Sequence, residues 1–76
     1  MSRIKELRKK RGYTQIKMQM LTGIDLSAYS KIERGQRYMS FEQCMRIALA
    51  LNTSMDYLAG LTDDPKPYPR GNGGEK

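Results

Sequence analysis

The sequence predicts a small all-α protein with a compact five-helix domain. Helix start and stop signals recur at short intervals, whereas no segment shows the alternation of β-branched residues that marks a strand. A chain of 76 residues has room for one small domain. Such a domain buries only about 60% of the surface of its unfolded chain, so we expect no large enclosed pocket.

The first two helices are delimited by a polar cap and by glycines. We predict the first helix over about residues 2–11, because Gly12 follows it and ends it. Thr14 can cap the N–H groups at the start of a second helix, predicted over about residues 14–22. Gly23 then tolerates the positive φ that a tight turn requires.

The third helix is predicted over about residues 26–34, with Asp25 as its N-cap and Gly35 as its end. A connecting loop follows over residues 36–39. The second and third predicted helices are thus two short helices separated by a glycine turn. This is the helix-turn-helix plan, in which the second helix of the pair enters the major groove of DNA.

The last two helices also begin at capping residues. Ser40 and Gln43 form a capping box at the start of a fourth helix. Apolar residues spaced by three and four predict one buried stripe along it, made of Phe41, Cys44, Ile47, Ala48 and Leu51. A short fifth helix is predicted over residues 54–59, and the domain is expected to close near Leu61.

Residues 62–76 contain three prolines, three glycines and almost no apolar side chains. Burial therefore cannot offset the entropy lost on ordering them, and we expect a flexible tail after a domain over residues 1–61. The composition of the tail fits the stub of a longer protein as well as it fits a binding segment.

The net charge of +6 is concentrated in the first half of the chain. Residues 1–39 carry ten Lys or Arg against three acids, while residues 40–76 carry four against five. This asymmetry suggests a polyanionic partner, because neutralised phosphates release counterions. A solvated basic surface explains the charge alone equally well.

Residue types needed for catalysis are scarce in this sequence. It has no histidine, no phosphate-binding glycine loop and no recognisable pair of carboxylates, so we expect no enzyme. Neither Cys/His spacing nor a calcium loop is present, so we expect no metal and no cofactor. The single cysteine, Cys44, lies on the predicted apolar stripe and is expected in the core.

The cysteine count and the length of the apolar runs indicate where in the cell the protein is located. One cysteine cannot form an intrachain disulfide, which fits a reducing environment. The apolar runs are far shorter than the roughly 20 residues that span a bilayer, and the first residues lack the apolar stretch of a signal peptide. We therefore expect a cytoplasmic protein with no membrane contact.

The third helix is amphipathic. At about 100° per residue, Tyr29 and Ile32 lie on one side of it. The other side is polar and basic, with Ser27, Ser30, Lys31 and Arg34. One face is therefore suited to packing and the opposite face to DNA.

Each polar residue type on that face has a chemical use. Ser27 and Lys31 can hydrogen-bond base edges, and Arg34 can bind a phosphate through two N–H groups. Leu26 can touch a thymine methyl or belong to the core. Gln15, at the start of the preceding helix, can clamp a phosphate or serve only as a helix former.

Several short motifs then resemble one family, that of the Cro and phage repressors, also called Xre-like. They are Thr14-Gln15, Gly23-Ile24, Ser30-Lys31-Ile32-Glu33-Arg34-Gly35 and Leu51-Asn52-Thr53-Ser54-Met55-Asp56-Tyr57-Leu58. The resemblance covers about residues 2–61 and implies a sequence-specific transcription regulator that reads double-stranded DNA with its third helix. It further implies frequent homodimers. We expect a repressor, and two-fold pairing would then make its target an inverted repeat.

The resemblance also implies roles for individual residues. Positions directed at bases are Leu26, Ser27 and Lys31. Positions directed at the DNA backbone are Gln15, Arg34, Gln36 and Arg37, to which the helical face adds the hydroxyl of Ser30. Arg8 and Glu33 match positions that form a partly buried ion pair between the first and third helices.

Some residues depart from the family pattern. Gln19 stands where alanine usually permits close helix approach, and Tyr29 replaces a branched aliphatic residue. The hydroxyl of Tyr29 needs solvent or a buried partner, and we expect it at the rim of the core.

Two apolar residues of the second helix, Ile16 and Met20, have no evident core role. They are either scattered surface residues or part of a partner surface. The latter gives the alternative function, a protein-interaction or antitoxin-like module with DNA binding secondary.

Overall fold

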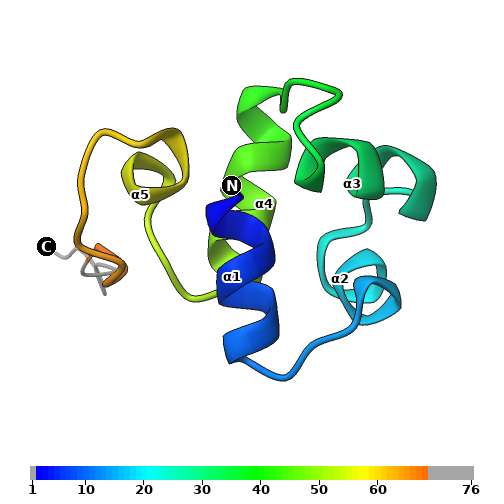
Figure 1. Ribbon diagram of the computed structural model, residues 1–76, viewed down its shortest axis with the longest axis horizontal. Helices are drawn as coiled ribbons and strands as arrows, with labels where there is room; N and C mark the ends of the chain where they lie inside the picture. The colour runs from blue at the N-terminus through cyan, green and yellow to red at the C-terminus, as the bar shows by residue number, and fades with distance from the viewer. Residues whose placement is uncertain (1, 69–76) are drawn as a thin grey trace, which may run out of the picture.

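The structure is a computed structural model that describes residues 2–68, so the end of the predicted tail, residues 69–76, lies outside it. Five helices form within this range, which confirms the predicted all-α class (Figure 1). They are α1 (Arg3–Lys10), α2 (Gln15–Thr22), α3 (Leu26–Glu33), α4 (Phe41–Ala50) and α5 (Met55–Ala59). Within residues 2–68, no helix has the length and apolar character needed to cross a membrane.

The predicted caps are confirmed. Thr14 accepts a hydrogen bond from the backbone N–H of Lys17, and the Asp25 carboxylate accepts one from Ser27. Ser40 and Gln43 form the reciprocal capping box at the start of α4. Each cap satisfies an N–H group that has no partner within its own helix, which is why the helices begin where the sequence predicts.

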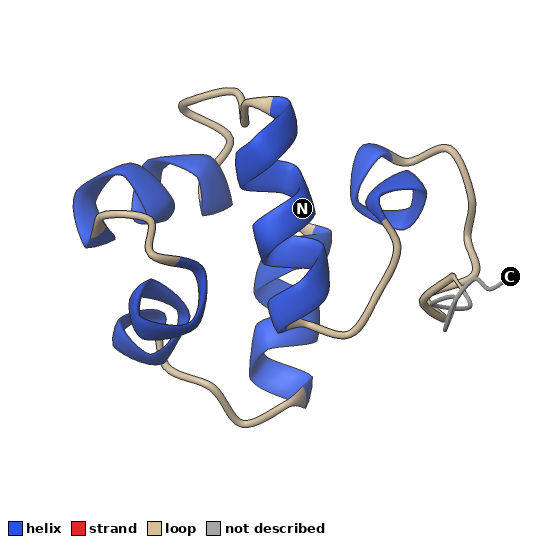
Figure 2. Ribbon diagram, turned by 180° about the vertical axis from the view of Figure 1, so that it is seen from behind, coloured by secondary structure: helices blue, strands red, loops and turns tan. Residues whose placement is uncertain are grey.

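The core lies where α1, α2 and α3 meet α4. In Figures 1 and 2, α4 runs through the centre of the molecule, with α2 and α3 on one side and α5 on the other. The buried apolar side chains are Ile4, Leu7, Met18, Ile24, Tyr29, Ile32, Ile47 and Leu51. Every helix except α5 contributes to this cluster, so α3 is held against the rest of the domain by its inner face.

The buried stripe of α4 is shorter than predicted. Phe41 is 73% exposed and Cys44 is half-buried, so the prediction of both as core residues is wrong. Steps of three residues fall about 60° short of a full helical turn, so Phe41 lies about 120° around the helix from Ile47. The fully buried residues of the predicted stripe are Ile47 and Ala48 in α4 and Leu51 just beyond its end.

The first part of the predicted tail, residues 62–68, lies against the domain. Arg3 donates a hydrogen bond of 2.7 Å to the carboxylate of Asp63. Thr53 donates one of 2.6 Å to the backbone carbonyl of Pro65. These bonds connect the chain after α5 to α1 and to the residues that precede α5.

Candidate nucleic-acid interface

α2 and α3 are joined by a tight turn that begins at Gly23. This glycine has φ of 73°, in the left-handed region that residues with a Cβ disfavour. Arg46, from α4, donates a hydrogen bond of 3.2 Å to the carbonyl of Thr22 at the end of α2. A Cβ at position 23 would lie 3.1 Å from the same guanidinium, which would have to shift slightly, so the backbone conformation is the main reason for glycine here.

The outer face of α3 is polar and basic. Ser27 and Lys31 are exposed along this helix, and Arg34 is exposed just beyond its end. Tyr29 and Ile32 are buried on the opposite face. This outer face, with Ser30 and the loop residues Gln36 and Arg37, is named here the α3 face.

Leu26 lies at the first position of α3 and is half-buried. Its side chain therefore has one part covered by the domain and another part open to solvent. The sequence left core packing and groove contact as alternatives for this residue, and half-burial is compatible with both.

The basic end of the α3 face is held in place by hydrogen bonds. Arg34 donates one of 2.9 Å to the hydroxyl of Ser30 and one of 3.3 Å to the side-chain carbonyl of Gln36. Arg37 is exposed in the following loop. The guanidinium of Arg34 is thus oriented along the surface beside other groups that can bind phosphate.

A buried polar network supports the α3 face from behind. The Arg8 guanidinium donates two hydrogen bonds to the Glu33 carboxylate, one to each oxygen, at 2.9 and 3.0 Å. The hydroxyl of Tyr29 donates a bond of 2.7 Å to Glu33, and the Gln15 amide donates one of 3.0 Å. The network therefore connects α1, α2 and α3 through one carboxylate that is only 3% exposed.

This network corrects one prediction. Tyr29 was expected at the rim of the core, but it is fully buried with 0% exposure. Its hydroxyl finds a buried partner in Glu33, one turn further along the same helix. Since the hydroxyl is satisfied, the large aromatic ring can occupy the centre of the core.

The side chain of Gln15 faces this network as well. Its amide nitrogen carries two hydrogens, and one of them is donated to Glu33. The other hydrogen is what a phosphate contact would use. Gln15, the first residue of α2, therefore connects the start of this helix to the buried carboxylate.

The network sets the protonation of its members. Burial alone would raise the pKa of the Glu33 carboxyl, but the hydrogen bonds it accepts, first from Arg8, outweigh burial and lower that pKa. The bond to Glu33 raises the pKa of the Arg8 guanidinium. Burial, and then the bond to Glu33, raise the pKa of the Tyr29 hydroxyl. At neutral pH the network is thus carboxylate, guanidinium and neutral phenol.

We expect acid to destabilise the fold through Glu33. Its carboxyl has a lower pKa in the folded state than the value of about 4.3 for an unperturbed glutamate, so the unfolded chain binds the proton more readily. The stabilisation from Glu33 is complete above about pH 4.3 and is lost as the pH falls through the lower folded pKa. Urea unfolding from about pH 7 to about pH 2 measures this loss.

Two variants separate Glu33 from other carboxylates in that experiment. In Glu33→Gln, the free energy of unfolding should depend clearly less on pH in the acid range, because glutamine does not titrate. Glu42→Gln removes an exposed carboxylate on α4 and should leave the dependence close to that of the parent protein. Equal acid dependence in Glu33→Gln and the parent protein would contradict the role assigned to Glu33.

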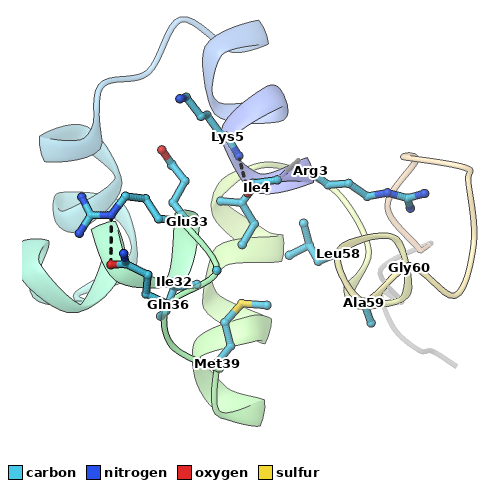
Figure 3. A pocket seen from close by; sticks show the side chains of 13 residues that line it. Arg3, Ile4, Lys5, Ile32, Glu33, Gln36, Met39, Leu58, Ala59 and Gly60 are labelled. Carbon is cyan, nitrogen blue, oxygen red and sulfur yellow. Dashed lines mark hydrogen bonds between the residues drawn. The ribbon is translucent and has the colours of Figure 1, made fainter.

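An open groove lies beside the α3 face, between α1, the end of α3 and α5 (Figure 3). Its volume is about 840 Å³, and Ile4, Ile32 and Met39 lie along it. Figure 3 shows Gln36 at one end and Gly60 at the other. The groove therefore borders the α3 face at Gln36 and remains open to solvent.

Sequence reasoning missed the role of Gln19. The sequence shows this residue only as a departure from alanine, whereas in the structure its side-chain carbonyl accepts a hydrogen bond of 2.7 Å from the backbone N–H of Leu26. The signal was a polar side chain of suitable length, facing the turn from the preceding helix. The side-chain carbonyl of Gln19 therefore accepts its hydrogen bond from the first residue of α3 instead of from solvent.

Two helices joined by a tight glycine turn, the second with a polar, basic outer face, define a helix-turn-helix domain. Comparison with known families agrees, because a family model described as Helix-turn-helix matches residues 4–58. The chain belongs to the helix-turn-helix family, and the resemblance to Cro and phage repressors is confirmed.

Among known proteins, the chain is similar to YobD of Bacillus subtilis (strain 168), an uncharacterized HTH-type transcriptional regulator. The two are 32% identical over 65 residues, which is 86% of this chain and 58% of YobD. The chain thus spans less than two thirds of the length of this relative. No solved structure matches the chain significantly.

Proposed function

We propose that this chain binds double-stranded DNA sequence-specifically and regulates transcription as a repressor, with α3 in the major groove. The observation that carries the proposal is the α3 face, whose outward side chains are supported by the buried Arg8–Glu33 pair. Family membership and the regulator YobD support the same function. In this proposal the bound protein represses by excluding other proteins from the DNA that it occupies.

The α3 face divides into two chemical parts. Along the helix, Ser27 and Lys31 offer a hydroxyl and an ammonium group for base edges, and the neighbouring Leu26 offers an apolar contact. At its end, Arg34 and Arg37 offer guanidinium groups for phosphates. Gln15, Ser30 and Gln36 complete the proposed backbone contacts.

Amide chemical shifts of the isotope-labelled protein, titrated with a pool of random-sequence duplex DNA, test where DNA binds. The proposal predicts large changes over residues 26–37 and at Gln15. No change at these residues at low salt would contradict it.

The proposed target is an inverted repeat bound by a homodimer. Two-fold symmetry would place two recognition helices about 34 Å apart, one turn of DNA. The proposed contact lies at α5 and its flank, with Met55, Tyr57 and Leu61, of which Leu61 is 77% exposed. Sedimentation equilibrium with a palindromic duplex should give two chains per duplex. One chain per duplex at saturating protein would contradict the dimer.

A second candidate, a protein-interaction or antitoxin-like role, is favoured by the outer surface of α2. Ile16 is 60% exposed and Met20 is 72% exposed, one turn apart on this helix. Apolar side chains in such positions can bind a partner protein.

Substitution of both residues tests whether this α2 surface belongs to the DNA site. We expect Ile16→Ser with Met20→Ser to leave the affinity for DNA within about twofold of the parent protein, because neither residue lies on the α3 face. Fluorescence anisotropy with labelled duplex measures this affinity. Loss of DNA binding in a folded double variant would show that the α2 surface belongs to the DNA site.

A further inference from the structure

α2 and α3 are linked by a side chain as well as by their turn. The side-chain carbonyl of Gln19, in the second half of α2, accepts the hydrogen bond of 2.7 Å from the backbone N–H of Leu26. Leu26 is the first residue of α3, so the bond spans the whole turn between the helices. The position of α3 relative to α2 therefore depends on this bond in addition to Gly23.

The bond satisfies a group that the helix itself cannot satisfy. The first N–H groups of an α-helix have no acceptor within it. In α3, the Asp25 carboxylate takes the N–H of Ser27 at 3.1 Å, and Gln19 takes the N–H of Leu26. Two donors of the first turn are thus bound to side chains, and the Asp25 carboxylate adds a negative charge beside them.

This arrangement disfavours a phosphate at the start of α3. Helix N-termini bind anions when their N–H groups are free and no anion stands nearby. Here Asp25 supplies the anion, and Gln19 occupies the outermost N–H of the helix. The first turn is therefore better suited to face bases than to grip the backbone.

We infer that Gln19 is a positioning residue for base reading, because it fixes the first turn of α3 from which Leu26 and Ser27 project. The inference rests on the proposed function and deepens it. Gln19 acts through the backbone of Leu26, so its substitution should change which bases are preferred more than it changes contact with phosphates. Base contacts require closer placement than the electrostatic attraction of the backbone does.

Three single variants test this role. Gln19→Met keeps the length of the side chain but removes the acceptor, whereas Gln19→Glu keeps an acceptor for the N–H of Leu26. Gln43→Ala is the matched control, because Gln43 also accepts a backbone N–H at a helix start, in the capping box of α4. Hydrogen exchange of the Leu26 amide, and the ratio of affinities for preferred and scrambled duplexes, are measured for each.

Gln19→Met should speed exchange of the Leu26 amide and lower the affinity ratio, each by about fivefold, as expected for the loss of one hydrogen bond. Gln19→Glu should keep both the exchange rate of the Leu26 amide and the affinity ratio close to those of the parent protein. Its added charge weakens binding to both duplexes alike and so cancels in the ratio. Gln43→Ala should lower stability while leaving the ratio and Leu26 exchange unchanged.

Three results would overturn the inference, and they differ from one another. An unchanged ratio in Gln19→Met would show that the bond does not govern base reading, with the proposed function intact. A reduced ratio in both Gln19 variants, with Leu26 exchange unchanged, would show that Gln19 acts through its amide nitrogen instead. A parent protein without any sequence preference would overturn the proposed function and this inference together.

Discussion

Replacement of Arg8 with alanine is expected to lower the free energy of unfolding by about 3–5 kcal/mol. The substitution leaves the Glu33 carboxylate buried without its cationic partner, although Tyr29 and Gln15 still donate to it. Small domains have a total stability of only about 5–15 kcal/mol, so much of the fold's margin depends on this pair. DNA binding should fall mainly because the protein unfolds.

Urea and thermal unfolding measure this loss, with Lys9→Ala as the matched control. Lys9 is an exposed cation on the same helix, and its removal should change stability by no more than about 0.5 kcal/mol. A double variant, Arg8→Met with Glu33→Met, removes both charges and should recover part of the loss. An Arg8→Ala protein as stable as Lys9→Ala would contradict the role given to the pair.

Replacement of Lys31 with alanine is expected to weaken binding to the preferred DNA by about 1–3 kcal/mol and to relax the preference at one base position. Lys31 is exposed on the outer face of α3, where it can reach guanine acceptors. Ser27→Ala should act in the same way at a neighbouring position. Both effects should be small on scrambled DNA, because neither variant removes a phosphate contact in the proposal.

Arg37→Ala is the contrasting variant. Its guanidinium is exposed in the loop after α3, and its loss should weaken all sequences by similar factors and reduce the salt dependence of binding. Titrations of preferred and scrambled duplexes at two salt concentrations separate these patterns. Equal losses on both duplexes for Lys31→Ala and Arg37→Ala would refute the division between base and phosphate contacts.

The helices were predictable from the sequence because their signals are local. Capping residues such as Thr14, Asp25 and Ser40 act within one turn of chain, so the order and limits of the helices follow from them. The error at Phe41 arose from geometry, since a spacing of three drifts around the helix and leaves this side chain 73% exposed.

The polar network was predictable only in part. The Arg8–Glu33 pair was expected from the family resemblance, but the contacts of Tyr29 and Gln15 with Glu33 depend on how three helices pack. Side-chain lengths and spacing do not determine such contacts before the helices are placed. The bond from Gln19 to Leu26 depends on the turn conformation for the same reason.

Selection of bound sequences from a random duplex library, followed by titration of the selected duplex against scrambled DNA at two salt concentrations, tests the central claim most directly. The account predicts an enriched inverted repeat, bound at least about a thousandfold more tightly than scrambled DNA. Weak binding with no enriched sequence would contradict sequence-specific regulation and would favour the protein-interaction role of the α2 surface.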